Sequence, residues 1–503
     1  MSLDPTVYGD LFLSLLPEVV LTAWSLVLLL FVAWRHRTVR DLRIAGGLTL
    51  LAFFSTAVAV WWLWWNRATA QASLSMVAVD DFRWVADWIF LGAGALTVAI
   101  SFAYLEREQL LAPEYYVLLV FGVLGMMIMA AGSDLMVIFL GLELMSVAVY
   151  VLAGFDRRRA RSAEAALKYF LLGAFASGFL LYGIALAYGA TGATNLGLIG
   201  AHLVGAGKPG VMLLAGLALL IVGFAFKIAA VPFHMWAPDV YDGAPTPVTA
   251  FMATGVKAAA FAALFRVMNQ AFGAVTAWHD ILWWLAVLTM LGGNLFALAQ
   301  RSLKRMLAYS SVAHAGYLLV AVSAGGPAGS SAFLVYVIAY TLMSLGAFAV
   351  LSAKGRAGES DVLIDDLAGL ANRRPWMAFA LAICMLSLLG FPGTAGFIGK
   401  WYILIAATSA GQNTLAAILV LTSVVSAGYY LPVIMAMYMK PEPIEAAHVD
   451  VKLDRWGRVA VAAAVVALLV FGVWPNRLFD LAKSAGDSVQ PAATSTAPPV
   501  SPR

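Results

Sequence analysis

The sequence predicts an all-α polytopic membrane protein. Of its 503 residues, 62% are hydrophobic and only 12% are charged, whereas about a quarter of the residues of a soluble protein are charged. Apolar runs near or above about 20 residues, the length that spans a bilayer core, recur from Leu11 to Trp474. These runs are continuously apolar and do not alternate with polar residues, which excludes a closed β-barrel.

Counting the apolar runs predicts about fourteen spans. They centre near 11–34, 43–65, 84–104, 114–131, 134–155, 163–189, 210–231, 246–270, 280–300, 303–323, 331–353, 376–408, 413–438 and 457–474. Gly and Pro interrupt the seventh and the twelfth, where we expect broken helices. These two lie five spans apart. Because an odd offset reverses orientation, spans 4–8 and 9–13 are predicted to form two inverted five-helix repeats.

The predicted organisation has five parts. They are an N-terminal three-helix segment (1–113), a first repeat (114–270), a second repeat (280–440), a C-terminal helix (441–480) and a disordered tail (481–503) that ends in PAATSTAPPVSPR. The first apolar run is too long for a cleaved signal and ends in positive charge. The single cysteine, Cys384, excludes an internal disulfide and a Cys-ligated metal or cluster in this chain.

Basic residues in alternate loops predict the orientation. They follow spans one, five, nine, eleven and thirteen, and comprise Arg35, Arg37, Arg40, Arg43, Arg157, Arg158, Arg159, Arg161, Arg301, Lys304, Arg305, Lys354, Arg356, Arg373, Arg374, Lys440, Lys452, Arg455 and Arg458. We assign these loops to the cytoplasm, which places both termini on the opposite side. The acidic loop with Asp239 and Asp242 breaks the pattern, either as a capped loop or through a role in coupling.

Ionisable residues inside the spans are the candidate site. An ammonium at the centre of a bilayer costs roughly 2.5–3.5 kcal/mol on insertion scales. Lys227 precedes Pro232 and His234 at the first break, and backbone carbonyls freed near Phe226 to Ala230 could face a cavity. Lys257 follows a helix start, with Thr246 as N-cap, and lies roughly 16 Å along that helix.

Other single ionisable groups lie on separate spans. Glu143 shares a helix face with Ser146 and Tyr150. His314 is flanked by Ser310, Ser311 and Tyr317 in a polar stripe, and Lys400 follows the glycines of the second break. Lys168 lies about one turn inside its span and could either snorkel to the interface or serve proton entry.

Each of these residues also has a structural interpretation. A buried carboxylate or histidine can hold helices together by hydrogen bonds, and a histidine near a break can be a satisfied polar residue. The functional interpretation is favoured for Glu143, because a carboxylate this deep is costly where Ser or Asn would bond helices as well. It is also favoured for Lys227, which lies beside a helix break, and for Lys257, which is too deep to snorkel to the interface. The constellations of soluble enzymes, such as a Ser-His-Asp set or a His-rich metal site, are absent from the sequence, and so is a Gly-rich phosphate loop.

Four motif blocks resemble a known family. The blocks VPFHMWAPDVYDGAPTPVTAFMATGVKAAAF, EAALKYFLLGA, KRMLAYSSVAHAGYLLV and SLLGFPGTAGFIGKWY are similar to those of the antiporter-like membrane subunits of respiratory complex I, the bacterial NADH–quinone oxidoreductase. The resemblance covers roughly residues 10–475. The motif PDVYDGAP and a lysine at position 400 favour the subunit N branch.

The resemblance implies fourteen helices, two inverted repeats and a central hydrophilic axis. It implies a translocase subunit that moves protons in the bacterial plasma membrane and packs beside other membrane-arm subunits. It implies no redox or nucleotide site in this chain, since NADH, flavin, iron–sulfur clusters and quinone would be used elsewhere in the complex. Glu143 and Lys227 would form a coupling pair, Lys257 a central relay and Lys400 an exit group, with His234 and His314 as bridges.

Three other functions stay open at this stage. The first is a subunit of a cation/proton antiporter of the same fold. The second is a structural subunit whose charges only bind helices together. The third is transport of an organic solute, which would need a substrate-sized polar pocket that no sequence feature demands.

Overall fold

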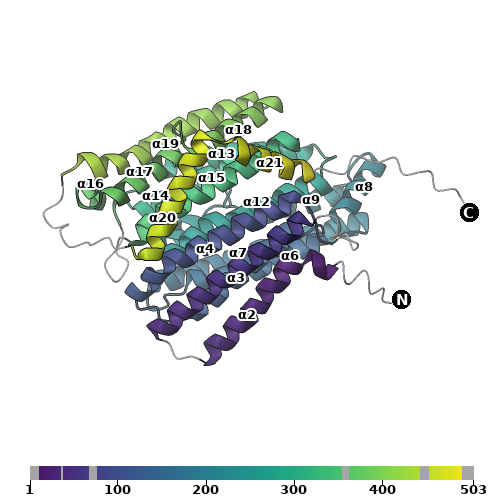
Figure 1. Ribbon diagram of the computed structural model, residues 1–503. Coiled ribbons are helices and arrows are strands. Elements are labelled where there is room, and N and C mark those ends of the chain that lie inside the picture. The colour runs from purple at the N-terminus through teal and green to yellow at the C-terminus, as the bar shows by residue number, and fades with distance from the viewer. Residues whose placement is uncertain (1–10, 35–37, 67–75, 354–361, 442–452, 490–503) are drawn as a thin grey trace, which may run out of the picture.

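The computed structural model describes residues 11–34, 38–66, 76–353, 362–441 and 453–489 (Figure 1). Long helices lie side by side in a single bundle, with short helices at its ends. Within the described ranges, pairing of the strand type is limited to three isolated β-bridges. The prediction of an all-helical membrane protein is therefore confirmed.

The helices follow one another along the chain with short connections. They are α2 (Leu16–Trp34), α3 (Val39–Trp65), α4 (Asp81–Arg107), α5 (Glu114–Ala131), α6 (Leu135–Ala153), α7 (Ala160–Thr191), α8 (Leu196–Ala206), α9 (Val211–Lys227), α10 (Trp236–Gly243), α11 (Thr246–Phe251), η2 (Met252–Val256), α12 (Lys257–Arg266), η3 (Val267–Ala271), α13 (Ala277–Leu298), α14 (Leu303–Ala324), α15 (Gly326–Ala353), η4 (Ile364–Leu367), α16 (Leu370–Arg373), α17 (Pro375–Leu389), α18 (Ala395–Ser409), α19 (Asn413–Met439), α20 (Arg455–Val473) and α21 (Asn476–Ser488).

Twelve helices of the described residues are long and apolar enough to cross a membrane. They coincide, within a few residues, with twelve of the predicted spans. At the predicted seventh span, α9 stops at Lys227 and α10 begins at Trp236. At the predicted twelfth, α17 stops at Leu389 and α18 begins at Ala395. Each interruption thus lies beside one of the candidate lysines.

Side-chain caps explain where several helices begin. Asp80, Asp134, Ser302 and Asp454 each accept a hydrogen bond from a backbone amide in the first turn of the helix that follows. The first amides of a helix have no partner within it, so a short polar side chain at this position stabilises the start by about 1 kcal/mol. These residues therefore set where the spans start.

The helix that carries Lys257 differs from the prediction at both its start and its middle. Its first residue is Thr246, and the capping position before it is held by Pro245. The prediction of Thr246 as N-cap is wrong, because the helix extends one residue further back than expected. A π-helical turn, η2, lies directly before Lys257. Such turns insert an extra residue into a helix and are frequent at functional sites.

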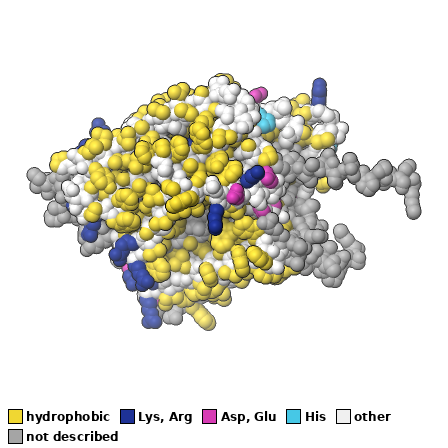
Figure 2. All heavy atoms as spheres, turned by 45° about the horizontal axis from the view of Figure 1, so that its top comes forward, with side chains coloured by type: hydrophobic (Ala, Val, Ile, Leu, Met, Phe, Trp, Pro, Cys, Tyr) yellow, Lys and Arg dark blue, Asp and Glu magenta, His cyan; other side chains and the backbone are white. Residues whose placement is uncertain are grey.

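Burial divides the bundle into core and surface helices. In the most apolar stretch of the helix from Thr246 to Ala271, 100% of the residues are buried. The corresponding share is 94% for α14 and only 28% for α2. Figure 2 shows one face of the molecule, covered mostly by hydrophobic side chains, with Lys and Arg gathered near its left edge. The helices that carry Lys257 and His314 are therefore screened from lipid.

The C-terminal region corrects one prediction. Disorder from residue 481 onwards is wrong as far as Val489, because α21 continues to Ser488 and packs on α4 and α15. Leu478 and Ala482 are buried on its inner face, and Ser484 donates to Asp81. This segment is an amphipathic helix, and burial of its apolar face against the bundle explains why it is folded. Figure 1 shows α21 crossing the neighbouring helices obliquely.

Several sequence predictions concern residues outside the described ranges. These are the remainder of the tail, 490–503, and five of the basic residues used for the orientation: Arg35, Arg37, Lys354, Arg356 and Lys452.

Candidate functional site

Lys227 lies at the last position of α9, with its ammonium inside the protein. Its Nζ donates to the Ser146 hydroxyl at 2.8 Å and to the Tyr169 hydroxyl at 3.3 Å. The rings of Tyr150 and Tyr169 lie 5.4 and 5.2 Å from the same atom. The ammonium is therefore held by neutral oxygens and by the negative faces of two aromatic rings.

Glu143 lies one turn before Ser146 on α6 but does not touch Lys227. Its carboxylate accepts a hydrogen bond from Ser177 at 2.5 Å, and the ion pairs of the described residues include none between Glu143 and Lys227. Glu143 is half-buried and close enough to act on Lys227 electrostatically. The two residues therefore lie near each other, and Ser146 provides the direct contact to Lys227. Their role as a coupling pair stays a prediction.

A small cavity lies beside Lys227. Ser177, Tyr150 and Phe226 contribute to its lining, and its volume is about 10 Å³. This is near the lower limit for a single water molecule.

The backbone break after Lys227 is filled by side chains. The indole nitrogen of Trp236 donates to the Phe226 carbonyl at 2.9 Å, and the Val231 amide donates to the Thr289 hydroxyl at 2.9 Å. The Phe226 carbonyl, one of those expected to face a cavity near the break, therefore accepts a hydrogen bond from Trp236, which folds back onto it. The same indole ring stacks on Tyr169 with centroids 4.4 Å apart.

His234 does not join the buried lysines. Its ring stacks on Phe296 of α13 at 6.1 Å, and its Nδ1 has no hydrogen-bond partner in the part of the chain that the structure describes. It is half-buried at the surface of the break. The geometry gives no support to the predicted bridging role of His234.

Lys257 contacts a residue of α14. Its Nζ donates to the Ser311 carbonyl at 2.7 Å and to the Ser311 hydroxyl at 2.5 Å. Only 2% of the residue is exposed, and no carboxylate of the described residues forms an ion pair with it, so dipoles compensate its charge. The side chains of Tyr241 and Tyr340 also interact with Ser311.

His314 is the centre of a group of hydroxyls. Its Nδ1 is 2.5 Å from the Tyr336 hydroxyl and its Nε2 is 3.0 Å from the Tyr430 hydroxyl. Tyr430 in turn is hydrogen-bonded to Ser310, the neighbour of Ser311. All of these side chains are buried. His314 is therefore part of a continuous set of groups that can accept and donate protons.

Lys400 uses the backbone of the second break. Its Nζ donates to the carbonyls of Leu388 and Leu389 at 3.1 and 3.0 Å. The chain turns there at Gly390, whose φ of +89° suits glycine. The ring of Tyr317 lies 4.7 Å from the ammonium. The carbonyls at the end of α17, where the chain is interrupted, therefore hold the Lys400 ammonium.

Tyr317 connects the surroundings of Lys400 with those of His314. Its ring meets the imidazole edge to face, with centroids 5.3 Å apart. Its hydroxyl accepts a hydrogen bond from Asn294 at 3.2 Å, and Asn294 accepts one from Tyr429 at 2.8 Å. Polar groups from α13, α14 and α19 thus meet beside the imidazole.

Lys168 belongs to a different environment. Its Nζ lies 2.7 Å from Glu164 and 3.2 Å from Asp239, and 43% of its side chain is exposed. Arg305 also binds Asp239, at 3.0 Å. These residues, with Arg161 and Asp242, line a cavity of about 200 Å³. Lys168 therefore lies in a charged surface pocket. The acidic stretch predicted to be a loop forms α10 and provides Asp239 and Asp242, whereas Glu164 comes from α7.

The structure thus sorts the seven predicted residues. Lys257, His314 and Lys400 come together around α14, Lys227 and Glu143 lie between α6, α7 and α9, and Lys168 and His234 lie apart from these two groups. Sequence analysis missed the aromatic hydroxyls, namely Tyr169, Tyr241, Tyr336, Tyr340, Tyr429 and Tyr430. Tyrosine is common on apolar spans, so its presence alone does not separate a site from packing.

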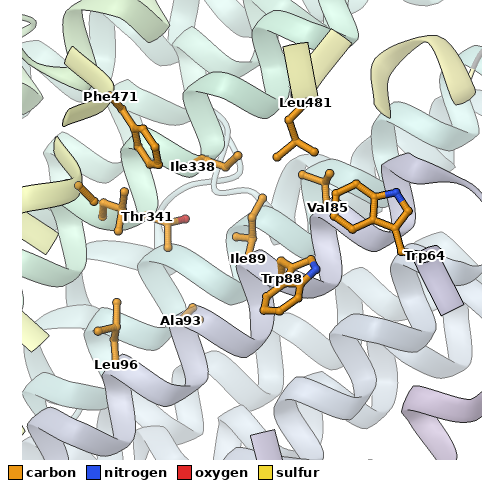
Figure 3. A pocket seen from close by; sticks show the side chains of 13 residues that line it. Trp64, Val85, Trp88, Ile89, Ala93, Leu96, Ile338, Thr341, Phe471 and Leu481 are labelled. Carbon is orange, nitrogen blue, oxygen red and sulfur yellow. The ribbon is translucent and has the colours of Figure 1, made fainter. Parts of the chain in front are cut away.

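A larger cavity lies apart from these polar groups. It measures about 370 Å³ and lies between α4, α15, α20 and α21. Figure 3 shows Trp64, Trp88, Phe471 and Leu481 around it, with Thr341 contributing an oxygen. Its lining carries no charged side chain, so it offers no group that could bind a proton.

Comparison with known proteins identifies the family. The family described as "NADH:quinone oxidoreductase/Mrp antiporter, TM" matches residues 132–426. NADH-quinone oxidoreductase subunit N of Gemmatimonas aurantiaca is 46% identical, over 97% of this chain and 96% of the relative. The protein of the same name from Trichlorobacter lovleyi is also 46% identical, over 94% and 96%.

Solved structures agree with this grouping. A chain of respiratory complex I from Thermus thermophilus is 37% identical, with a TM-score of 0.79 over 93% of this chain and 99% of that chain. A chain of the Mrp complex from Dietzia sp. has a TM-score of 0.81 over 94% and 97% at 22% identity, which shows a shared fold alone. The resemblance found in the sequence motifs is confirmed: the chain belongs to the NADH:quinone oxidoreductase/Mrp antiporter family of membrane subunits, on its NADH-quinone oxidoreductase subunit N branch.

Proposed function

We propose that this chain is a proton-translocating membrane-arm subunit of an NADH–quinone oxidoreductase. The observation that carries the proposal is the row of buried ammonium and imidazole groups, Lys227, Lys257, His314 and Lys400, each held by neutral oxygens. Because none of the three ammonium groups has a carboxylate within ion-pair distance among the described residues, each is positioned to exchange its proton without first breaking a salt bridge. Subunit N relatives at 46% identity support the same assignment.

The route begins at the charged surface pocket around Lys168 and Asp239. From there protons pass to Lys227 and then to Lys257. The aromatic residues Tyr169, Trp236 and Tyr241 lie between these two lysines: Trp236 stacks on Tyr169 and meets Tyr241 edge to face at 5.9 Å.

The second half of the route runs through α14. Ser311 holds Lys257, and the adjacent Ser310 joins Tyr430 and His314. Lys400 is the exit-side group, next to the Tyr317 ring. Hydroxyl and imidazole groups can both donate and accept, which is the property that a proton-carrying chain needs.

Glu143 acts as the switch through its charge. With Glu143 ionised and near, the ammonium of Lys227 is favoured. When Glu143 moves away or takes up a proton, the proton on Lys227 becomes labile. Ser146 keeps Lys227 in place in both states, since it contacts the ammonium directly.

The proposed organisation has fourteen spans, with the α9–α10 and α17–α18 segments as the seventh and twelfth. Residues 114–270 and 280–440 form the two inverted repeats, between an N-terminal three-helix segment and a C-terminal helix. Extensive packing of α5 on α6 is matched by that of α13 on α14, which supports the repeat. Both termini are proposed to face away from the cytoplasm.

The chain is proposed to lie in the bacterial inner membrane beside other membrane-arm subunits. NADH, flavin, iron–sulfur clusters and quinone would be used by those other subunits, and this chain would bind protons alone. The runner-up is a subunit of a cation/proton antiporter, whose fold is the same. The 46% identity to subunit N relatives, against 22% to the Mrp chain, favours the respiratory enzyme.

The test is the Lys227→Ala variant in membranes, with NADH oxidation and proton pumping measured together and assembly checked by co-purification with the NADH-oxidising subunits. Loss of both activities in an assembled complex, or fewer protons per electron, supports the relay. Normal values of both would refute it. Failure of the chain to co-purify with any NADH-oxidising subunit would favour the antiporter.

A further inference from the structure

Five ionisable residues form a second buried cluster, at the other end of the bundle from Lys168. They are Glu18 on α2, Asp80, Arg83 and Asp87 at the start of α4, and Arg266 at the end of α12. Arg83, Asp87 and Arg266 are 0% exposed. Arg266 follows Lys257 by nine residues, or roughly 14 Å along the helix. None of the five takes part in the relay proposed above.

Each guanidinium in the cluster has its own carboxylate. Arg83 donates from Nη2 to both oxygens of Glu18 at 2.7 and 2.8 Å, and from Nη1 to the Ala78 carbonyl at 2.8 Å. Arg266 donates to both oxygens of Asp80 at 2.6 and 2.9 Å. These are geometries of strong, charge-assisted hydrogen bonds.

Asp87 is the third carboxyl group and has no such donor. Neither of its oxygens has a hydrogen-bond partner within the described part of the chain. The Nε of Arg83 lies 3.7 Å from it, which is too long for a hydrogen bond. By contrast, Asp81 at the start of α4 accepts hydrogen bonds from Trp64 and Ser484.

Counting charges assigns a proton to Asp87. Arginine stays protonated in proteins, so three carboxylates against two guanidinium groups would leave one net negative charge away from water. The charges acting on Asp87 are those of Glu18, Asp80, Arg83 and Arg266. An uncompensated buried charge costs several kcal/mol, and the carboxyl group without donors is the one that avoids this cost by holding a proton.

We propose that Asp87 is a proton-binding site, occupied in this arrangement, and that the Glu18–Arg83 ion pair controls its occupancy. If Arg83 turned its hydrogen bonds from Glu18 to Asp87, the O–H bond of Asp87 would break and the proton would pass to water. The guanidinium would then compensate the new carboxylate. Because α2 is the least buried of the twelve candidate spans, a shift of α2 relative to α4 is the movement that would separate the pair.

The test is infrared spectroscopy of the assembled complex near neutral pH, which detects the carbonyl band of a protonated carboxylic acid. The Asp87→Asn variant replaces that acid with a neutral group of the same shape. A carboxylic-acid band present in the wild type and lost in this variant supports the proposal. Absence of any lost band shows that Asp87 is ionised and overturns it.

Two further variants test whether Glu18 controls the protonation of Asp87. Glu18→Gln weakens the hold of α2 on Arg83, and we expect loss of the Asp87 band without any change at Asp87 itself. Persistence of the band would overturn the control by Glu18. Asp81→Asn, six residues earlier on α4, is the matched control and should leave the Asp87 band in place. The readout does not depend on pumping, so it stands apart from the test of the relay.

Discussion

The ammonium of Lys257 donates to both the carbonyl and the hydroxyl of Ser311, a residue 54 positions further along the chain. Lys257 therefore has a strong neutral partner within the core. The preceding residue on the helix, Ser310, is hydrogen-bonded to Tyr430, whose hydroxyl lies 3.0 Å from His314 Nε2.

Ser311→Ala should impair pumping. A hydrogen bond to a charged group contributes about 1.5–3 kcal/mol, so its loss shifts the protonation equilibrium of Lys257 by roughly tenfold or more. We expect fewer protons per NADH oxidised in inverted membrane vesicles. Ser323→Ala, on the same helix and hydrogen-bonded to Gln412, is the control. Equal pumping by the two variants would contradict the role of Ser311.

Gly390→Ala should displace Lys400. A Cβ at this position would lie 3.0 Å from Lys400 Cδ, in a backbone with φ of +89°, and the backbone alone costs roughly 1–2 kcal/mol. We expect reduced proton pumping in the assembled complex. Gly411→Ala carries a similar backbone cost at φ +76° with nothing within 4 Å. An equal loss in both variants would show that strain, and not the lysine, is responsible.

Ser146→Ala should harm pumping more than Ser177→Ala. Ser146 contacts the Lys227 ammonium directly, whereas Ser177 donates to Glu143. The first change removes a bond to a charged donor worth about 1.5–3 kcal/mol. Proton uptake and NADH oxidation in membranes would be compared for both variants. A greater loss in Ser177→Ala would place the more important contact at Glu143.

Lys168→Ala should have a milder effect than Lys257→Ala. The Lys168 side chain is 43% exposed, and solvent screens the ion pairs of an exposed group. The surface pocket also keeps Arg161 and Arg305 as cations. Steady-state pumping in the two variants, normalised to assembled complex, checks this order. Complete loss of pumping in Lys168→Ala would make it an obligatory entry group.

Glu108→Gln should destabilise the chain without touching the relay. The Glu108 side chain is 1% exposed and binds Arg107 at 2.9 Å and Arg159 at 2.7 Å. Because these arginines are partly exposed, we expect a loss of about 1–3 kcal/mol. Thermal unfolding of the purified complex measures it. Glu106→Gln breaks the exposed pair with Arg43 and should cost about 0–1 kcal/mol; an equal loss would refute the distinction.

Sequence analysis did not identify the buried cluster around Asp87. The third span was predicted to begin near residue 84, which assigned Asp80 and Arg83 to a loop. In the structure α4 begins at Asp81 with Asp80 as its cap, so Arg83 lies inside the helix. Three ionisable residues at 80, 83 and 87, with helical spacing, were the available signal. Their partners Glu18 and Arg266 lie 65 and 186 positions away along the chain.

The sequence by itself determined the membrane class, twelve of the spans to within a few residues, and the burial of Lys227, Lys257 and Lys400. A bilayer requires apolar segments of a fixed length and makes a charge inside them costly. Both the segments and the rare charges within them can therefore be recognised in the sequence. Only the tertiary structure decided what each charge touches: Ser146 for Lys227, Ser311 for Lys257. Such contacts join helices distant in sequence, and they depend on helix rotation and packing, which residue type and spacing along one span do not encode.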